Sequence, residues 1–303
     1  MKKIKFLLLA TVIAAVIIVL PSCQSTKTTT AAKMLKFNFE KGKGYDYEMN
    51  TNMDQEIMGQ TIGMDMLFYY SMDVKDDDGT TKTITTSVDR FKMKVSAMGM
   101  NIDIDTDKPM PNMGLTKDGE DPAKMINSLF GAIKGQKFSM KVNAEGKVLE
   151  VTGFENMAKT IVDSLAMNEE EKEKMMQQFS KQFSAEQMKS QFERTWYIFP
   201  NKEVKVGDSW DKSTDIAGEM GGTYNSTYKV TDIEGDMVTL SESTKIESKQ
   251  KDMDMKGSIK GTIVVDSKLG LVVTADQDMK FTIGAEGKSM DIKAKTKIKG
   301  KAR

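Results

Sequence analysis

The sequence has no histidine, a single cysteine, only five prolines and no net charge, with 44 basic and 44 acidic residues. Without histidine there are no Ser–His or Cys–His nucleophile pairs and no histidine zinc sites, and the commonest general base is missing. One cysteine excludes an internal disulfide. The charge balance argues against a nucleic-acid partner, because proteins that bind nucleic acid carry a dominant basic surface. Methionine, in contrast, occurs 26 times.

No catalytic group stands out among the remaining residue types. An enzyme without histidine needs paired carboxylates or a Ser–Lys pair, and nothing in the sequence selects two of its 44 carboxylates. Ser184–Gln187 (SAEQ) lacks the lysine of an S-x-x-K motif, and no Gly-x-Ser-x-Gly motif or phosphate-binding glycine loop occurs. We therefore expect a protein that is not an enzyme, with no catalytic residue, no metal and no cofactor.

The first 23 residues have the order of a secretory signal. Three lysines within residues 2–5 precede the uncharged residues 6–20, and Leu20–Cys23 (LPSC) follows. The apolar run is shorter than the roughly 20 residues that a membrane-spanning helix needs. Leucine three residues before the only cysteine, with serine directly before it, resembles the lipobox of bacterial lipoproteins. The resemblance implies a signal peptide over residues 1–22 that is removed, and acyl chains on Cys23.

The residues after Cys23 favour a particular membrane. Residues 24–33 (QSTKTTTAAK) are too poor in apolar side chains to fold and indicate a flexible tether. Gln24 stands where an aspartate would resemble an inner-membrane retention cue, and the tether lacks the acidic run that resembles a surface-export signal. We expect attachment to the outer membrane through the lipid at Cys23, on the periplasmic face.

From Met34 the chain alternates apolar and polar residues, which predicts β-strands. The longest run places every even residue from Ile62 to Val74 on one face. Asp76–Gly79 (DDDG) reads as a hairpin turn, and a change of parity at Ala97–Met98 predicts a bulge or tight turn. We predict a first β block over residues 34–110 and a second over 200–303.

Residues 111–199 between the blocks are predicted to be mainly helical, with one β-hairpin over Phe138–Val151. Apolar residues from Phe154 to Leu165 recur at helical spacing. Asn168 with Glu171, and Ser184 with Gln187, read as capping boxes. Asp121-Pro122 predicts another helix start, before Met125, Ile126, Leu129 and Ile133.

The two β blocks share a pattern at a constant offset of 156 residues. Phe68, Met72, Val74, Gly79 and Ile84 correspond in this way to Tyr224, Tyr228, Val230, Gly235 and Leu240. The sequence thus predicts a mainly β (α+β) fold: two antiparallel meanders, derived from an internal duplication, with a central helical segment that joins them or packs on them.

Several short motifs accompany this arrangement: a hairpin at Glu145–Val148 (EGKV), Val206–Trp210 (VGDSW), and a turn at Asp266–Gly270 before Leu271. Together with the lipobox they resemble an uncharacterised family of two-repeat, β-rich lipoproteins of Bacteroidetes-type Gram-negative bacteria. The resemblance implies a fold and a location. It implies no activity and no site residues, because the family has no established function.

The methionines allow three interpretations. Pairs such as Met64 with Met66, and Met253 with Met255, place two thioethers on one face of a strand, and thioethers select Cu(I). The same side chains fill an apolar core or line a groove for a hydrophobic guest. Core filling already explains Met64 and Met66. The acidic runs at 76–78 and 101–107 read as a turn and a solvent-facing strand side, not as calcium sites.

Two classes of function remain open. The first is a non-enzymatic binding module for a hydrophobic or lipid-like molecule. The second is a structural or interaction lipoprotein, fully packed inside, that contacts another envelope component. The candidate ligand-binding residues share one parity on two strands and are Met64, Met66, Phe68, Tyr70, Met279 and Phe281.

Overall fold

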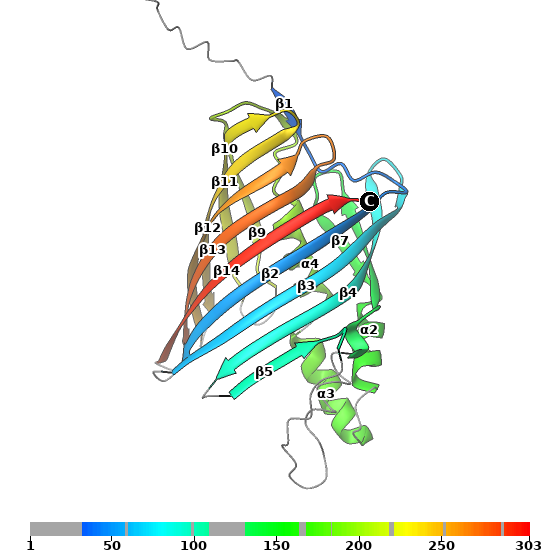
Figure 1. Ribbon diagram of the computed structural model, residues 1–303, viewed down its shortest axis with the longest axis vertical. Coiled ribbons are helices and arrows are strands. Elements are labelled where there is room, and N and C mark those ends of the chain that lie inside the picture. Colours follow the sequence, from blue (N-terminus) through cyan, green and yellow to red (C-terminus); the bar gives the residue numbers. More distant parts are fainter. Residues whose placement is uncertain are drawn as a thin grey trace, which may run out of the picture. The chain divides into compact units, whose positions relative to one another are not determined.

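Figure 1 shows the computed structural model of the chain, which describes residues 32–57, 60–97, 100–108, 131–163, 168–182, 184–217, 221–250, 253–285 and 288–303. The predicted signal peptide, Cys23 and the helix start at Asp121-Pro122 lie outside the described residues. Within these ranges, no helix has both the length and the apolar character needed to cross a membrane.

The fold is mainly β, as the alternation predicts, with one antiparallel sheet of 12 strands, a separate two-stranded sheet and few helices. The first part of the chain forms β1 (Lys33–Leu35), β2 (Gly44–Ile57), β3 (Gln60–Asp77), β4 (Thr81–Ala97), β5 (Met100–Asp105), β6 (Lys137–Asn143) and β7 (Val148–Thr152). The helices are α2 (Phe154–Asp163), α3 (Glu169–Gln182) and α4 (Ala185–Trp196). The last part forms β8 (Lys202–Val204), β9 (Ser209–Asp215), β10 (Thr223–Glu234), β11 (Met237–Gln250), β12 (Met253–Asp266), β13 (Leu271–Ala285) and β14 (Lys288–Ala302).

Both β blocks belong to one sheet. Its order is β7-β6-β4-β3-β2-β14-β13-β12-β11-β10-β9, and β5 pairs with β4 beside β6. The C-terminal strand β14 lies against β2, with Ala302 opposite Tyr45 and Asp291 opposite Glu56 (Figure 1). The hairpin β6–β7, which the sequence assigned to the helical connector, also joins this sheet through β4. We call β2–β7 the first half of the sheet and β9–β14 the second half.

The duplication is visible in the strand registers of the two halves. In the hairpin β3–β4, Val74 lies opposite Ile84, and a bulge follows between Val74 and Asp76. In β10–β11 the residues 156 positions later do the same: Val230 lies opposite Leu240, and the register shifts between Val230 and Asp232. A bulge conserved at one point of a hairpin is a specific feature. The offset predicted from the sequence is confirmed here.

The next hairpins of the two halves also correspond. Val142 lies opposite Val148 in β6–β7, and Val265 lies opposite Val272 in β12–β13, each beside a register shift. The turns contain Gly146 (φ 86°) and Gly270 (φ 60°). A Cβ on either glycine would overlap a backbone carbonyl oxygen, that of Trp196 and that of Lys36 respectively. Each turn therefore packs against the chain segment that precedes the other half.

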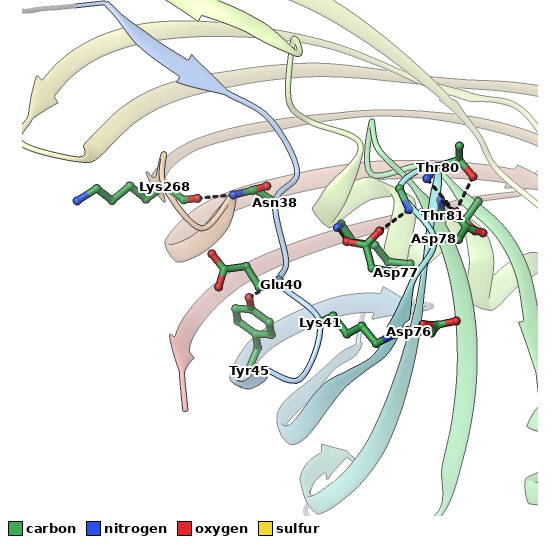
Figure 2. Close-up of polar contacts among 12 residues, drawn as sticks. Asn38, Glu40, Lys41, Tyr45, Asp76, Asp77, Asp78, Thr80, Thr81 and Lys268 are labelled. Carbon is green, nitrogen blue, oxygen red and sulfur yellow. Dashed lines mark hydrogen bonds and ion pairs between the residues drawn. The ribbon is translucent and has the colours of Figure 1, made fainter.

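The two segments that precede the halves, residues 33–39 and 196–204, form the arms of the fold. They pair through β1 and β8, with Leu35 opposite Lys202. Figure 2 shows the first arm crossing to the second half, where the Asn38 side-chain amide donates to the Lys268 carbonyl oxygen at 2.8 Å. The arm then returns to its own half, where the Glu40 N–H donates to the Tyr45 hydroxyl at 3.0 Å.

The hairpin turn predicted at Asp76–Gly79 is present, and its carboxylates hold it (Figure 2). Asp78 Oδ1 accepts hydrogen bonds from the backbone N–H groups of Thr80 and Thr81, at 2.8 and 2.7 Å. Lys41 pairs with Asp76 at 2.6 Å. The carboxylates of this acidic run therefore stabilise the turn.

Helix α4 contacts both edge strands of the sheet, β7 and β9. Its predicted capping box is confirmed: the Gln187 N–H donates to Ser184 Oγ, and the Ser184 N–H donates to Gln187 Oε1. The box at Asn168 and Glu171 is confirmed in the same way at the start of α3. Because one helix touches β7 and β9, the side chains of α4 reach both halves of the sheet.

The main core lies where the arms and α4 meet the sheet. The Phe39 and Tyr45 rings stack at 3.9 Å between centroids, and the Tyr47 and Tyr70 rings stack at 5.2 Å. Trp196 at the end of α4 is 1% exposed. The opposite face of the sheet is charged: lysines of β14 pair with acidic residues on both neighbours, such as Lys295 with Asp278. The sheet therefore has an apolar inner face and a charged outer face.

One strand is continuous in the second half and split in the first. β11 pairs along its whole length with β12, whereas β4 pairs with β5 at one end and with β6 at the other. A charged network sits at the split, where Arg90 donates to Asp105 at 2.9 and 2.7 Å and pairs with Asp107 at 2.9 Å. These contacts hold the C-terminal end of β5 against β4.

Candidate functional site

The inner face of the sheet divides into a packed region and a half-buried apolar region. Near the arms, inner-face residues such as Met72, Val74 and Ile84 are at most 1% exposed. Farther along the same strands, inner-face residues keep part of their surface accessible. We call this second region the methionine band; it consists of Met53, Met64, Met66, Met93, Val95, Ile102, Met279, Phe281 and Ile292.

The registers place these side chains in rows that cross the strands. Met64 lies opposite Met53 on one side and Val95 on the other, and Met66 lies opposite Met93. Met279 lies opposite Ala294, which in turn lies opposite Met53. The band therefore extends over neighbouring strands of both halves. A continuous, half-exposed apolar surface of this kind is typical of a binding surface.

The structure separates the six predicted ligand-binding residues into three settings. Met64 and Met66 lie in the band, and Met279 and Phe281 lie in it three strands away, beside a small cluster of Ile246, Met255 and Ile259. Phe68 packs against the main core.

Tyr70 is buried, whereas the other five side chains keep part of their surface accessible. It is 9% exposed, its ring stacks on Tyr47, and Phe192 of α4 meets it edge-on with centroids 6.2 Å apart. Burial raises the pKa of its hydroxyl. Sequence parity placed Tyr70 on the correct face but could not show that α4 covers it.

A buried polar row borders the band in the second half. Glu242 and Thr244 of β11 are 7% and 2% exposed. Thr244 Oγ1 lies 2.9 Å from Glu242 Oε1 and 2.7 Å from Ser226 Oγ. The Gln277 side-chain amide donates to Glu242 Oε2 at 2.6 Å. Both oxygens of this carboxylate are therefore engaged.

The contact between Glu242 and Gln277 depends on a glycine. Gly261 of β12 lies between them, opposite both residues in the register. A Cβ at Gly261 would lie 2.9 Å from Gln277 Cγ. Because Gly261 has no side chain, Glu242 reaches across one strand to Gln277.

A small cavity of about 10 Å³ opens beside the polar row, large enough for one water-sized group. It lies between the end of α4 and strands β9, β10, β11 and β12, and its lining includes Glu193, Arg194, Tyr197, Lys212, Tyr224, Ser226, Tyr228, Glu242, Thr244 and Ile259. Tyr224 and Ile259 also belong to the apolar cluster beside Met279. The cavity thus connects the polar row with the methionine band.

The two cations of the cavity lie on aromatic rings. The Arg194 guanidinium lies 4.5 Å from the centroid of the Tyr224 ring, and Lys212 Nζ lies 3.8 Å from that of Tyr197. Burial lowers the pKa of the Lys212 ammonium. Cation–π contacts of this kind hold both side chains against the cavity wall.

Glu193 is the lining residue with unused hydrogen-bonding capacity. It is 7% exposed and belongs to α4, which contacts the edge strand β7. Its Oε1 atom has no hydrogen-bond partner among the described residues. Burial is the main cause that raises the pKa of the Glu193 carboxyl. A buried acceptor without a hydrogen bond costs folding free energy. Glu193 is therefore the residue of this site with an unmet hydrogen bond within the described chain.

Sequence reasoning missed Glu193 and Glu242. Each carried a signal: Glu242 interrupts the apolar parity of Leu240 and Ile246 in β11, and Glu193 follows Phe192 on the packed side of α4. Neither signal shows that the two carboxylates share a cavity, because α4 and β11 come together only in the folded sheet.

A second hollow, of about 930 Å³, is lined mainly by residues of β2, β3, β4, β13 and β14, and just over half of its lining residues are charged. Its charges are largely paired, for example Arg303 with Asp46 and Asp73, at 2.8 and 2.7 Å. Across the described ranges, no three acidic or cysteine side chains are grouped so that they could hold a metal ion. The candidate ligand site is therefore the Glu193 cavity, which has a carboxylate oxygen unpaired in the part of the chain that the structure describes, together with the partly accessible methionine band.

Comparison with known proteins gives a family and a weak set of structural likenesses. A lipovitellin structure described by its lipid–protein interactions is similar at 8% identity, with a TM-score of 0.42; the match covers 88% of this chain and 26% of that one. The translocator domain of autotransporter NalP from Neisseria meningitidis is similar at 6% identity and a TM-score of 0.23, over 86% of this chain and 89% of that one. OccK7 from Pseudomonas aeruginosa is similar at 6% identity and a TM-score of 0.20, over 87% of this chain and 99% of that one.

With TM-scores this low, these likenesses carry no argument about function, and this chain spans only about a quarter of lipovitellin. No curated protein matches the sequence. Residues 79–272, well over half of the chain, match a family described as "Family of unknown function (DUF6263)". The match includes the three motifs Glu145–Val148, Val206–Trp210 and Asp266–Gly270 with Leu271, on which the resemblance rests. The chain belongs to the DUF6263 family of unknown function.

Proposed function

We propose that this protein is a non-enzymatic, lipid-anchored module of the cell envelope that binds a hydrophobic, lipid-like molecule on the inner face of its sheet. The observation that carries the proposal is the methionine band. Nine apolar side chains, contributed by both halves, form one surface and keep part of it accessible. Met and Phe suit such a surface because their side chains adapt to guests of different shape.

The packed region of the same face supports this assignment. Near the arms, the sheet buries its apolar residues against aromatic side chains and α4. Where the arms and α4 cover the sheet, its apolar residues therefore form a tightly packed core. A protein with a purely structural role would gain stability from covering Met64 and Met66 in the same way, since burying a Met side chain contributes about 1.5–3 kcal/mol.

The location follows from the same proposal. A lipobox at Leu20–Cys23 and a tether of about ten residues would hold the sheet near a membrane, on the periplasmic face of the outer membrane. A module that takes up lipid-like molecules needs access to a membrane, and the charged outer face of the sheet leaves the inner face for the guest.

The test is native mass spectrometry of the full-length protein purified from its own envelope, followed by solvent extraction. We expect a co-purifying hydrophobic molecule. Met66→Asp, which places a charge in the band, should abolish its retention while circular dichroism stays β-rich. The matched control is Asp65→Asn, which changes the neighbouring residue on the exposed outer face and should retain the guest.

A protein that carries no guest under mild purification, and whose Met66→Asp variant behaves like the wild type, would contradict the proposal. That result would favour an interaction protein that contacts another envelope component. The band would then be the surface to examine for a protein partner.

A further inference from the structure

We infer that the Glu193 cavity is the head-group site for the hydrophobic guest, and that it selects an amphiphile whose head ends in a hydrogen-bond donor, a primary amine or a hydroxyl. This inference rests on the proposed function. It names the chemical class of the molecule that the methionine band would hold.

The first argument is the hydrogen-bonding state of the cavity. Glu242 has both carboxylate oxygens engaged, by Thr244 and by Gln277. Glu193 has one oxygen, Oε1, without a partner in the described part of the chain, and the side chain is 7% exposed. A carboxylate is an acceptor when ionised, so the group that completes the site must be a donor.

The second argument is charge. Arg194 and Lys212 line the cavity with Glu193 and Glu242, so its formal charges balance. Both cations lie over aromatic rings, and Lys212 loses part of its preference for the charged form through burial. An anionic head would meet two buried carboxylates, whereas a donor head meets an acceptor that lacks a hydrogen bond.

The third argument is size and position. A cavity of about 10 Å³ accepts one non-hydrogen atom, such as a terminal nitrogen or oxygen. Ile259 of the cavity wall lies opposite Met279 in the register, and Gln277 precedes Met279 by two residues on the same face of β13. A chain attached to that terminal atom therefore continues directly onto the band.

The experiment is a titration of the purified full-length protein with four amphiphiles that share a dodecyl chain: dodecylamine, dodecanol, dodecyltrimethylammonium and dodecanoate. Tryptophan fluorescence reports binding, because both tryptophans lie close to the site: Trp196 ends α4, and the Trp210 indole donates to the Ile198 carbonyl oxygen at 2.7 Å. We expect dodecylamine or dodecanol to bind at least about tenfold more tightly than the trimethylated amine and dodecanoate. The trimethylated amine keeps the charge and removes the N–H donors.

Glu193→Gln sharpens the test. The variant has nearly the same shape, but its amide NH₂ group is a donor where the carboxylate offered only acceptors. The preference for donor heads should disappear, and dodecanoate should gain relative to dodecylamine. Glu186→Gln is the matched control, since it makes the same change on the exposed side of α4 and should keep the preference.

The outcomes separate the two proposals. If all four amphiphiles bind with similar affinity to the wild type, the cavity holds only water and the head-group inference is overturned, while the hydrophobic-binding function stands. If none of the four binds, the proposed function fails as well. If donor heads bind preferentially but Glu193→Gln leaves the preference unchanged, the assignment of the head-group site to Glu193 is wrong.

Discussion

The two halves of the sheet have the same hairpin registers but different inner faces. Tyr70, Thr86 and Val88 of the first half correspond, 156 residues later, to Ser226, Glu242 and Thr244 of the second. In the first half all three positions are buried, and Tyr70 packs under Phe192 in the aromatic core. In the second half they form the polar row and line the cavity. One template therefore supports a packed core in one copy and a polar site in the other.

The split strand extends the contrast. In the first half β5 and β6 share the position beside β4, whereas in the second half β12 alone pairs along the whole of β11. The first half continues from β7 into α2, α3 and α4, and α4 brings Glu193 to the second half. Helix α4, which covers Tyr70 in the first copy, thus completes the cavity in the second, and this gives a physical reason for the two copies to differ.

The largest effect should come from breaking the exchange of arms between the halves. Gly146→Ala and Gly270→Ala each place a Cβ against the backbone of the opposite arm at a positive φ, and each should cost about 3 kcal/mol or more of unfolding free energy. Gly235→Ala, at φ 59° with open space around it, should cost only about 1–2 kcal/mol. Urea denaturation measures all three. Equal costs would mean that the arms do not pack as described.

The next effect concerns the split strand. Asp105→Asn removes the carboxylate to which Arg90 donates two hydrogen bonds at the end of β5 and should cost about 2–3 kcal/mol at neutral pH. Arg90 holds the pKa of the Asp105 carboxyl well below its usual range. This stabilisation is present above the unfolded pKa and is lost as pH falls through the folded one. The difference between wild type and variant should therefore shrink in strong acid; denaturation curves at several pH values would reveal a constant difference if this is wrong.

A smaller effect on stability is expected from replacing one inner-face threonine by valine in each half. Thr86 Oγ1 is buried without a partner in the described chain, whereas Thr244 Oγ1 bonds to Ser226 and Glu242. Thr86→Val should be neutral or stabilising by up to about 1 kcal/mol, and Thr244→Val should cost about 1–2 kcal/mol. Thermal unfolding of the two variants measures the difference, and the same sign for both would remove the contrast between the halves.

The smallest effect is the pH dependence that Glu193 contributes. Because its folded pKa is raised, the folded state binds a proton over a range in which the unfolded state has released it. Stability from this group is therefore largest at low pH and falls as pH rises from the unfolded pKa through the folded one. Glu193→Gln should flatten that slope and leave the variant slightly more stable at neutral pH.

The charged groups around Glu193 set the size of this slope. Lys189 and Lys147 favour its ionised form and Asp215 opposes it, while Arg194, Lys212 and Glu242 share the cavity. Unfolding curves from acid to neutral pH, with Glu186→Gln as control, provide the measurement. A Glu193→Gln variant with the wild-type slope would contradict the assignment.

Much of the fold follows from local sequence signals. Alternation predicts the strands, Gly79 and Asp78 predict the turn between β3 and β4, and the boxes at Asn168 and Ser184 predict the starts of α3 and α4. Each signal acts between residues close in sequence, so a single chain suffices to read it. The 156-residue offset is also readable, because both copies keep the same bulge.

The remaining features are set by contacts between distant segments. No local pattern shows that β14 pairs with β2, or that β6–β7 completes the first half instead of standing within a connector. Parity places Tyr70 beside Phe68 on one face, but only the position of α4 shows that Tyr70 is covered. The cavity escaped prediction for the same reason, since Glu193 and Glu242 meet only across α4 and β11.

The most direct test of the account is photolabelling of the full-length protein with a dodecylamine that carries a diazirine at the far end of its chain, followed by peptide mapping. The account predicts label on the methionine band, in peptides that contain Met53, Met64–Met66, Met93 or Met279–Phe281, and loss of this label in Met66→Asp. Label confined to the charged outer face, or to the exposed surfaces of α2 and α3, would contradict the claim that the inner face of the sheet holds the guest.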